Sequence, residues 1–264
     1  MKFHGMIWSV ALAVALAAPS AGAVTRQEKA IQDAMLVLRE VQAMPDQQIP
    51  DQLLARAEGI VILPANVKFA LIGGARFGGG VMLVRTENRQ WSNPVFVKAG
   101  GGSVGFQWGG QVADIILVLT TRRSIEGITD GKLTLGADAS VAAGPVGRTA
   151  MASTSLNFDS EVYAYSRTKG LFAGISLEGS GIFINDKYNR RFYDGDTSAT
   201  AILSATSAPP APANDLVAEV TRLTAGATPS VASENAESKD PAATRPAEPR
   251  TYPIPDEQPG TEPR

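Results

Sequence analysis

The stretch GGGSVGFQWGGQVADIILVLTT, Gly100–Thr121, contains the two features that organise this chain. Its first half is rich in glycine, and its second half is an apolar run, Val112–Leu119, interrupted only by Asp114. A nearly continuous apolar run of this kind is typical of a strand that is buried on both faces of its sheet. We therefore expect Val112–Thr121 to be a central strand with other structure packed on both sides.

Short apolar segments separated by glycines continue on both sides of this strand. Strands are predicted at 60–63, 81–85, 91–98, 132–135, 139–142, 149–155, 161–166, 172–177 and 181–184, whereas 68–72 fits either a strand or a helical turn. A short helix or turn is expected at 122–130, a polar segment at 185–195 and a last helical turn at 199–204. Many short strands with glycine at the joints favour an antiparallel barrel or sandwich, and the glycines let such a sheet curl.

Two helices are predicted before the strands. Thr25 and Glu28 fit a capping box, and apolar residues then recur at helical spacing until the helix ends near Ala43. This amphipathic helix either packs on the core or lies on a membrane surface. A second, short helix can start at Pro50. The fold class is therefore α+β, with N-terminal helices packed on a curled, mainly antiparallel β barrel or sandwich.

Residues 1–23 have the pattern of a secretory signal peptide. Lys2 supplies the positive charge, Met6–Ala18 is the apolar segment, and Ala21-Gly22-Ala23 is a cleavage site made of small residues. The alternative is an uncleaved anchor, but the apolar segment is short for a membrane span. We expect cleavage near Ala23 and a periplasmic or secreted protein that is soluble or peripheral to a membrane.

The composition changes again after the last predicted strands. From Ala205 the chain is rich in alanine, proline, serine and threonine, a composition that does not bury enough apolar surface to offset the entropy of ordering. The expected organisation is therefore a folded domain at 24–204 and a disordered tail at 205–264. Within the tail a short helix is expected at 214–223, which docks either on the core or on a partner.

The residue inventory argues against the common catalytic chemistries. The chain has no cysteine, and its only histidine, His4, lies in the predicted signal peptide. Gly101–Gly105 matches G-x-S-x-G, and Gly100, Gly102 and Gly105 match G-x-G-x-x-G, but a base for the serine and a following βαβ unit are both missing. We expect a non-enzymatic protein without a cofactor or metal. The net charge of −2 gives no argument for a nucleic-acid partner.

What remains is a scattered set of basic residues at predicted strand ends and turns. A group of such residues can hold anionic lipid headgroups if the fold brings them together, and the alternative is ordinary surface solvation. The set comprises Lys68, Arg76, Arg85, Lys98, Arg122, Arg123, Arg148, Arg167, Lys169, Arg190 and Arg191.

Six ordered blocks resemble the SYLF domain family, also called the yeast actin-patch-type actin-binding domain. The blocks are FGGGVMLVR (77–85), WSNPVFV (91–97), GGSVGFQWGGQVADIILVL (101–119), LGADASVAAGPVGR (135–148), YSRTKGLFAGISLEG (165–179) and RFYDG (191–195). The resemblance covers about residues 28–200 and identifies the chain as an exported bacterial member. It implies a lipid-binding module; the phosphoinositide affinity of eukaryotic members and the actin binding of some fungal members are not carried over.

In this family an N-terminal amphipathic helix and basic residues are implicated in lipid binding. Six residues are the candidates here: Arg26, Lys29 and Arg39 on the first helix, together with Arg148, Arg167 and Lys169 beside glycine-rich or turn segments. The expected function is binding of anionic phospholipid at a membrane surface in the bacterial cell envelope. The alternative is a structural or protein-interaction role in the periplasm, with the tail capturing an envelope protein partner.

Overall fold

The N-terminal helices begin where the capping pattern predicts. The computed structural model describes residues 24–44, 48–71, 73–103, 109–146, 158–168, 171–175, 177–195 and 198–225. Helix α1 spans Arg26–Gln42, and its first turn is closed by a reciprocal capping box between Thr25 and Glu28. Helix α2, Asp51–Ala55, begins directly after Pro50. Both predicted helices are therefore confirmed, because their start signals are local in the sequence.

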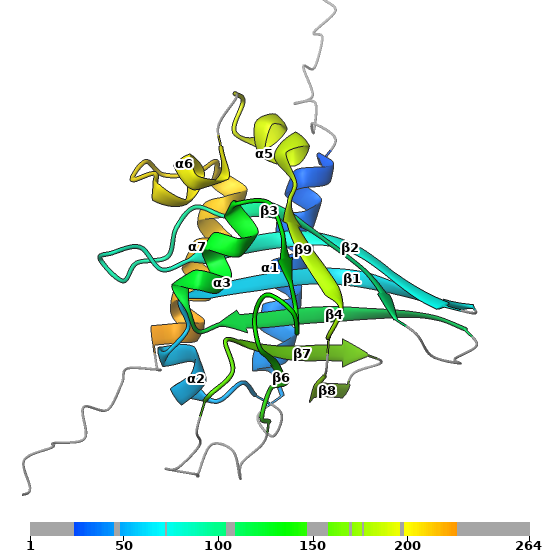
Figure 1. The fold of residues 1–264 in the computed structure, drawn as a ribbon. Helices are drawn as coiled ribbons and strands as arrows, with labels where there is room; N and C mark the ends of the chain where they lie inside the picture. The colour runs from blue at the N-terminus through cyan, green and yellow to red at the C-terminus, as the bar shows by residue number, and fades with distance from the viewer. Residues whose placement is uncertain are drawn as a thin grey trace, which may run out of the picture. The chain divides into compact units, whose positions relative to one another are not determined.

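Nine of the described segments are strands of one sheet (Figure 1). They are β1 Gly59–Leu71, β2 Gly73–Val84, β3 Val95–Ser103, β4 Gly109–Leu119, β5 Leu133–Thr134, β6 Val141–Ala143, β7 Val162–Thr168, β8 Leu171–Gly174 and β9 Ser180–Ile184. The strand order is β5-β9-β3-β2-β1-β4-β7-β6, with β8 also paired to β7. Every pairing is antiparallel except that of β6 with β7. The α+β class with a curled, mainly antiparallel sheet is confirmed.

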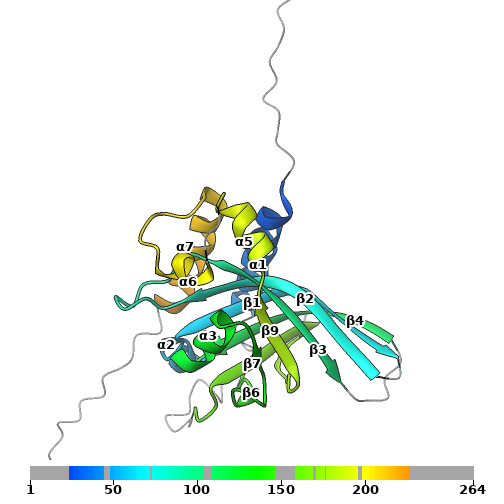
Figure 2. The same ribbon diagram turned by 45° about the horizontal axis from the view of Figure 1, so that its top comes forward.

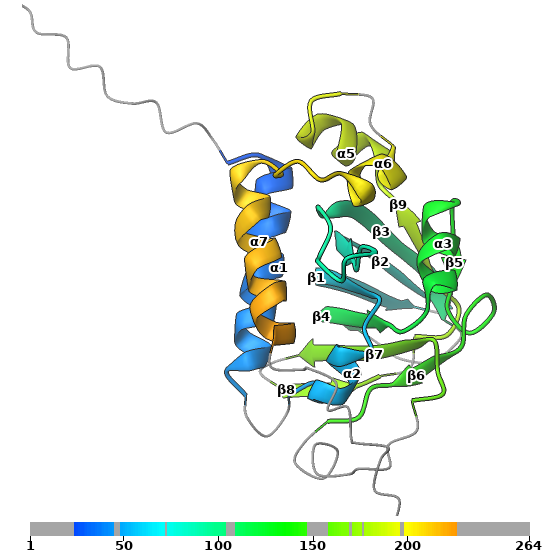
Figure 3. The ribbon, with the colours of Figure 1, turned by 90° about the vertical axis from the view of Figure 1, so that its left-hand side faces the viewer.

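The apolar run around Asp114 forms β4, which is buried on both faces as predicted. Alternate side chains enter two separate hydrophobic clusters: Ile116 and Val118 pack in one, and Ile115 and Leu117 pack in the other. The first cluster lies against α1, α2 and α7, and the second lies against α3 (Arg122–Thr129) and α6 (Ala199–Ser204). Figure 3 shows the sheet between these two groups of helices.

Helix α7, Ala211–Ala225, corrects the expected domain boundary. It begins before the predicted helix at 214–223 and lies alongside α1 (Figure 3). Ala213, Leu216 and Val220 are fully buried against the first cluster. The segment therefore belongs to the folded unit, which extends beyond residue 204, and disorder is ruled out for 211–225. The reason is that its apolar stripe finds a complementary face only in the tertiary structure.

Glycine-rich segments on both sides of the centre form strands β2 and β3. β1 continues through Pro64 to Leu71, with a bulge between Leu63 and Asn66 where its pairing with β4 shifts register. Proline is tolerated there because a bulge interrupts the regular backbone hydrogen bonds. The predicted strand end at Pro64 is therefore wrong, and Lys68–Leu71 is strand rather than helical turn. β1, β2 and β4 extend well away from the helices in both views (Figures 1 and 2).

The polar segment expected at 185–195 is largely a helix, α5, Asp186–Phe192. Its Asn189 is fully buried, and the side-chain oxygen accepts a hydrogen bond of 2.7 Å from the backbone N–H of Phe96. The Phe192 ring packs edge-on against the Phe96 ring at 5.3 Å. These are contacts with β3, far away in the sequence, so local periodicity did not reveal the helix. The strand predicted at 149–155 lies outside the described residues.

Candidate functional site

The three basic candidates on α1 lie on its outer surface, and two of them have acidic neighbours. Lys29 is paired with Asp33 at 2.8 Å, and Arg39 lies 3.7 Å from Glu219 of α7. Arg26 is exposed in the first turn. The structure does not bring these three residues together with the other described candidate, Arg167, into one cationic patch.

The apolar side of α1 faces the protein. Ile31, Leu38 and Val41 are at most 3% exposed and belong to the cluster between the sheet and α7. The core-packing interpretation of this helix is therefore the one that the structure supports. Leu36 is the outward exception, at 54% exposure, and a single exposed leucine needs no special explanation.

Arg167 occupies an ion-pair network rather than an open surface. It extends from β7 to Asp114 on β4 and to Glu40 on α1, the latter contact measuring 2.5 Å. Asp114 also accepts a 2.9 Å hydrogen bond from the backbone N–H of Ala65, at the bulge of β1. The acid that interrupts the apolar run therefore stabilises the bulge and links the sheet to α1. Arg148 and Lys169, the other two candidates, lie outside the described residues.

A different group of arginines lies near the start of β1, around Glu58. Arg89, in the connection from β2 to β3, and Arg122, at the start of α3, both pair with Glu58, and the Arg122–Glu58 distance is 2.8 Å. Arg85 follows β2 and donates a 2.7 Å hydrogen bond to the carbonyl of Arg89. We call Glu58, Arg85, Arg89 and Arg122 the arginine cluster. Within it three positive charges face one negative charge.

The electrostatics of the arginine cluster favour an additional anion. Burial lowers the pKa of the Arg85 guanidinium, repulsion from Arg89 lowers it further, and the Glu58 carboxylate opposes both effects. The guanidinium also stacks on the Trp91 ring at 4.2 Å, which fixes its position. The Arg89 and Arg122 side chains are about half exposed, at 51% and 48%. The cluster is thus partly ordered by the protein and partly open to a ligand.

This cluster is not predicted by the sequence analysis. Arg85 and Arg122 belong to the scattered basic set, but neither was singled out as a candidate, and Arg89 was absent from that set. Their partner, Glu58, is 27 to 64 residues away along the chain, and only the pairing of β1 with β2 and β4 brings it near. The one available signal is their position in the chain. Arg85 comes directly after β2, and Arg122 comes directly after Thr121, the N-cap of α3.

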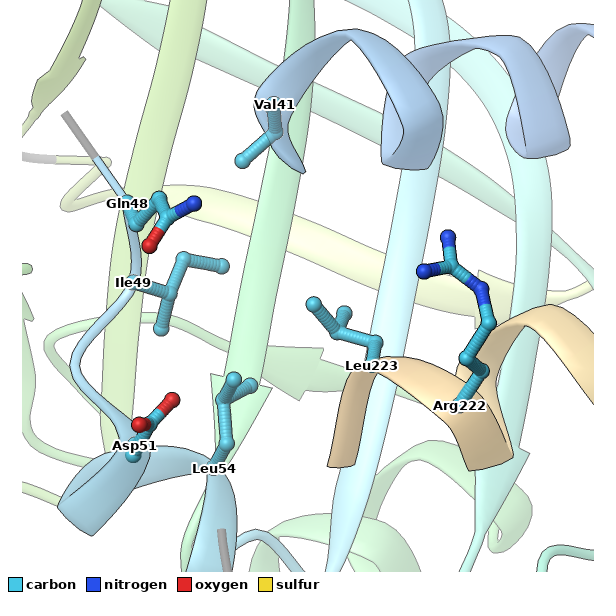
Figure 4. Close-up of a pocket in the computed structure, with 7 residues that line it drawn as sticks. All are labelled: Val41, Gln48, Ile49, Asp51, Leu54, Arg222 and Leu223. Carbon is cyan, nitrogen blue, oxygen red and sulfur yellow. The ribbon is translucent and has the colours of Figure 1, made fainter. Parts of the chain in front are cut away.

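A pocket lies beside α2, between the last turns of α1 and α7 (Figure 4). Its volume is about 290 Å³. Its lining side chains are Val41, Gln48, Ile49, Asp51, Leu54, Arg222 and Leu223. Figure 4 shows Gln48 and Asp51 on one side of the apolar residues and Arg222 on the other. The pocket therefore combines an apolar wall with polar groups of both charges.

Two further properties bound the chemistry of the described residues. Among them, no three or more histidine, cysteine or acidic side chains are grouped closely enough to hold a metal ion. In the same residues, no helix has the length and apolar character needed to cross a membrane. The fold and its surfaces define an α+β domain with a cationic cluster at one sheet end and a small amphipathic pocket between helices.

Comparison with known proteins shows which family this domain is similar to. Residues 100–223 match the family model described as "Ysc84: Las17-binding protein actin regulator". These residues include β4, β7, α5 and most of α7, so the match follows the folded unit beyond residue 204. Residues 100–223 are therefore similar to a Ysc84 family domain, in agreement with the resemblance to SYLF domains.

The similar proteins come from animals and fungi. The chain is 39% identical over 173 residues to "SH3 domain-containing YSC84-like protein 1" of Bos taurus, covering 65% of this chain and 50% of that protein. It is 38% identical over 168 residues to "LAS seventeen-binding protein 3" of Saccharomyces cerevisiae, covering 62% of this chain and 36% of that protein. The chain thus spans half or less of the length of these two relatives. The name of the yeast relative describes a binding protein.

Proposed function

We propose that this protein is a non-enzymatic module that binds anionic lipid headgroups on a membrane surface through the arginine cluster. The observation that carries the proposal is the pairing of Arg89 and Arg122 with the single carboxylate of Glu58, with the Arg85 guanidinium hydrogen-bonded to the carbonyl of Arg89 beside them. Arginine holds phosphate through paired N–H donors in a fixed plane, so a phosphate-bearing headgroup suits the excess positive charge.

The expected size of the effect is measurable. A basic residue near an anionic membrane surface contributes about 1 kcal/mol, so two arginines contribute on the order of 2 kcal/mol, or about thirtyfold in binding. The attraction is screened by salt, because Arg89 and Arg122 are about half exposed. Binding through this cluster should therefore weaken strongly as salt is added, whereas insertion of an apolar element would resist salt.

The test is flotation of the purified protein with vesicles of phosphatidylcholine alone or with added phosphatidylglycerol, at low and high salt. The double variant Arg89→Gln/Arg122→Gln should bind the anionic vesicles about thirtyfold more weakly than the natural protein. The matched control, Arg26→Gln/Arg39→Gln, removes the same charge from α1 and should lose less than threefold. Equal losses in the two variants would mean that net charge alone drives binding, and an absence of binding to anionic vesicles would refute the proposal.

The site of action belongs to the same proposal. The signal-peptide pattern at 1–23 supports export and cleavage near Ala23, so that the module meets lipid in the envelope of a bacterial cell. Mass spectrometry of the protein recovered from a bacterial periplasm should give a mature chain that begins at Val24. Recovery of the protein with its first 23 residues attached would contradict cleavage.

Protein capture is the second candidate function. The family description names a Las17-binding protein, which supports a protein partner in general, although the match covers the folded domain at 100–223 and not the segment after it. In the form proposed here, the segment after the folded unit holds an envelope protein while the domain holds the membrane. A chain truncated after residue 229 keeps α7 and the whole compact unit. Lipid binding should survive this truncation, whereas partner capture from an envelope extract should disappear.

A further inference from the structure

We infer that the pocket between α1, α2 and α7 binds the zwitterionic headgroup of an aminophospholipid, with its ammonium group at Asp51 and its phosphate at Arg222. The inference rests on the proposed membrane function, but it concerns a second site and a different lipid. It follows from the composition, size and charge arrangement of the pocket.

The apolar wall of the pocket is fixed by the core. Val41, Ile49 and Leu54 are at most 3% exposed, and they come from α1, from the segment before α2 and from α2 itself. Leu223 of α7 completes the wall and is half-buried (Figure 4). Because buried side chains from separate elements form this wall, the pocket is preformed. It places a small apolar surface beside the polar groups.

The acidic and basic side chains of the pocket lie on opposite sides of its apolar wall. The Asp51 carboxylate and the Gln48 side chain lie on the same side of the pocket, with Ile49 between them in Figure 4, whereas the Arg222 guanidinium lies on the other side of the wall. Arg222 is oriented by a 2.6 Å hydrogen bond to Glu219. A ligand that matches this arrangement carries a cationic donor and an anionic acceptor on one short body. A purely anionic ligand would meet the Asp51 carboxylate.

The kind of cation follows from the lining. A primary ammonium donates hydrogen bonds, which the Asp51 carboxylate can accept, whereas a quaternary ammonium donates none and is usually held by aromatic side chains. The lining residues include no aromatic side chain. At about 290 Å³ the pocket lies near the lower limit for small-molecule sites. It therefore suits an ethanolamine headgroup rather than choline or a complete lipid.

The experiment compares vesicles that differ only in this headgroup. Each vesicle contains the same fraction of phosphatidylglycerol, with the remainder either phosphatidylethanolamine or phosphatidylcholine of the same acyl chains. The natural protein should bind the ethanolamine vesicles about tenfold more tightly than the choline vesicles. Only the ethanolamine ammonium can donate charge-assisted hydrogen bonds to Asp51. Asp51→Asn should reduce this ratio to near one. The matched control is Asp186→Asn, which changes the corresponding first residue of α5 and should leave the ratio unchanged.

A second arm distinguishes the lipid from a soluble solute with the same chemistry. Glycerophosphoethanolamine is titrated into the isotope-labelled protein, and shifts of the Gln48 and Arg222 side-chain signals report on the pocket. Vesicle preference together with weak binding of the soluble compound supports the lipid headgroup. Tight binding of glycerophosphoethanolamine without a preference for ethanolamine vesicles would contradict the assignment of the ligand as a membrane lipid. Binding to the phosphatidylglycerol vesicles with a ratio near one and no shifts overturns the pocket assignment while leaving the arginine cluster intact.

Discussion

Two buried tyrosine hydroxyls make the stability of the folded protein depend on pH. The Tyr193 hydroxyl donates a 2.6 Å hydrogen bond to the carbonyl of Pro94, and the Tyr165 hydroxyl donates one of 3.1 Å to the carbonyl of Pro145. Burial raises the pKa of both side chains well above the ordinary value of 10.0. Each group is therefore held neutral in the folded protein at a pH where the unfolded chain ionises.

The sign of the effect follows from proton binding. Because the folded state holds these protons more tightly, the stabilisation is fully present below about pH 10 and is lost as the pH rises above it, by about 1.4 kcal/mol per pH unit for each tyrosine. Tyr193→Phe should be less stable than the natural protein at pH 8 by about 1 kcal/mol, through the lost hydrogen bond. The gap should narrow at pH 11. Urea unfolding at both pH values checks this prediction, and an unchanged gap would contradict it.

At the scale of single residues, the sequence predicted local interactions and missed distant ones. The Thr25–Glu28 capping box needs only neighbouring residues, and it forms as predicted. The role of Arg167 depends instead on Asp114 and Glu40, which the folding of three elements brings together. The arginine cluster has the same origin. A charged side chain can be recognised from the sequence, but its ion-pair partners cannot. Many oppositely charged residues could pair with it, and the tertiary structure determines which of them lies within contact distance.

At the scale of elements, two adjacent glycines of β2 should respond very differently to an added methyl group. A Cβ at Gly80 would lie 1.9 Å from the backbone carbonyl oxygen of Ile62, whereas a Cβ at Gly79 would meet its nearest atom, the Val97 carbonyl oxygen, at 3.6 Å. The obstruction at Gly80 is backbone of β1 just before the bulge, which cannot rotate away as a side chain can. Glycine is therefore required at 80 and merely tolerated at 79.

The expected outcome is a large difference between two chemically identical substitutions. Gly80→Ala should lower the free energy of unfolding by about 3 kcal/mol or more, because the backbone of β1 or β2 must shift. Gly79→Ala should stay within about 1 kcal/mol of the natural protein, since the contact is ordinary and alanine reduces the entropy of the unfolded chain. Urea unfolding of both variants measures the difference. Equal effects would show that the close approach at Gly80 is absent in solution.

The same strands show how tertiary structure overrides local composition. Glycine-rich Gly73–Gly80 has few of the side chains that favour strands, and Pro64 interrupts β1, yet both segments pair with neighbouring strands. Backbone hydrogen bonding to a strand on each side supplies the order that their side chains do not. Conversely, α5 and α7 have weak or partial helical patterns, and their contacts with β3 and α1 decide their extent.

At the scale of the whole molecule, α7 is part of the fold rather than of a tail. It covers α1, and the Trp91 indole N–H donates a 2.9 Å hydrogen bond to Thr224 near its end. Truncation after residue 204 should expose the buried face formed by Ile31, Leu38 and Val41, and should abolish cooperative unfolding. Truncation after residue 229 should leave the unfolding transition within about 1 kcal/mol of the natural protein. Thermal unfolding of the two chains compares them directly, and cooperative unfolding of the shorter one would contradict the role of α7.

What the sequence determined by itself is the class of the protein and the centre of its fold. The apolar run at 112–119 required a strand buried on both faces, the capping box fixed the start of α1, and the ordered blocks identified the family domain. Only the tertiary structure decided where the folded unit ends, that the apolar face of α1 is covered, and which arginines meet. The physical reason is the distance along the sequence over which each interaction acts. Capping and periodicity act between neighbouring residues, whereas burial and ion pairing depend on strand register and helix packing across the whole chain.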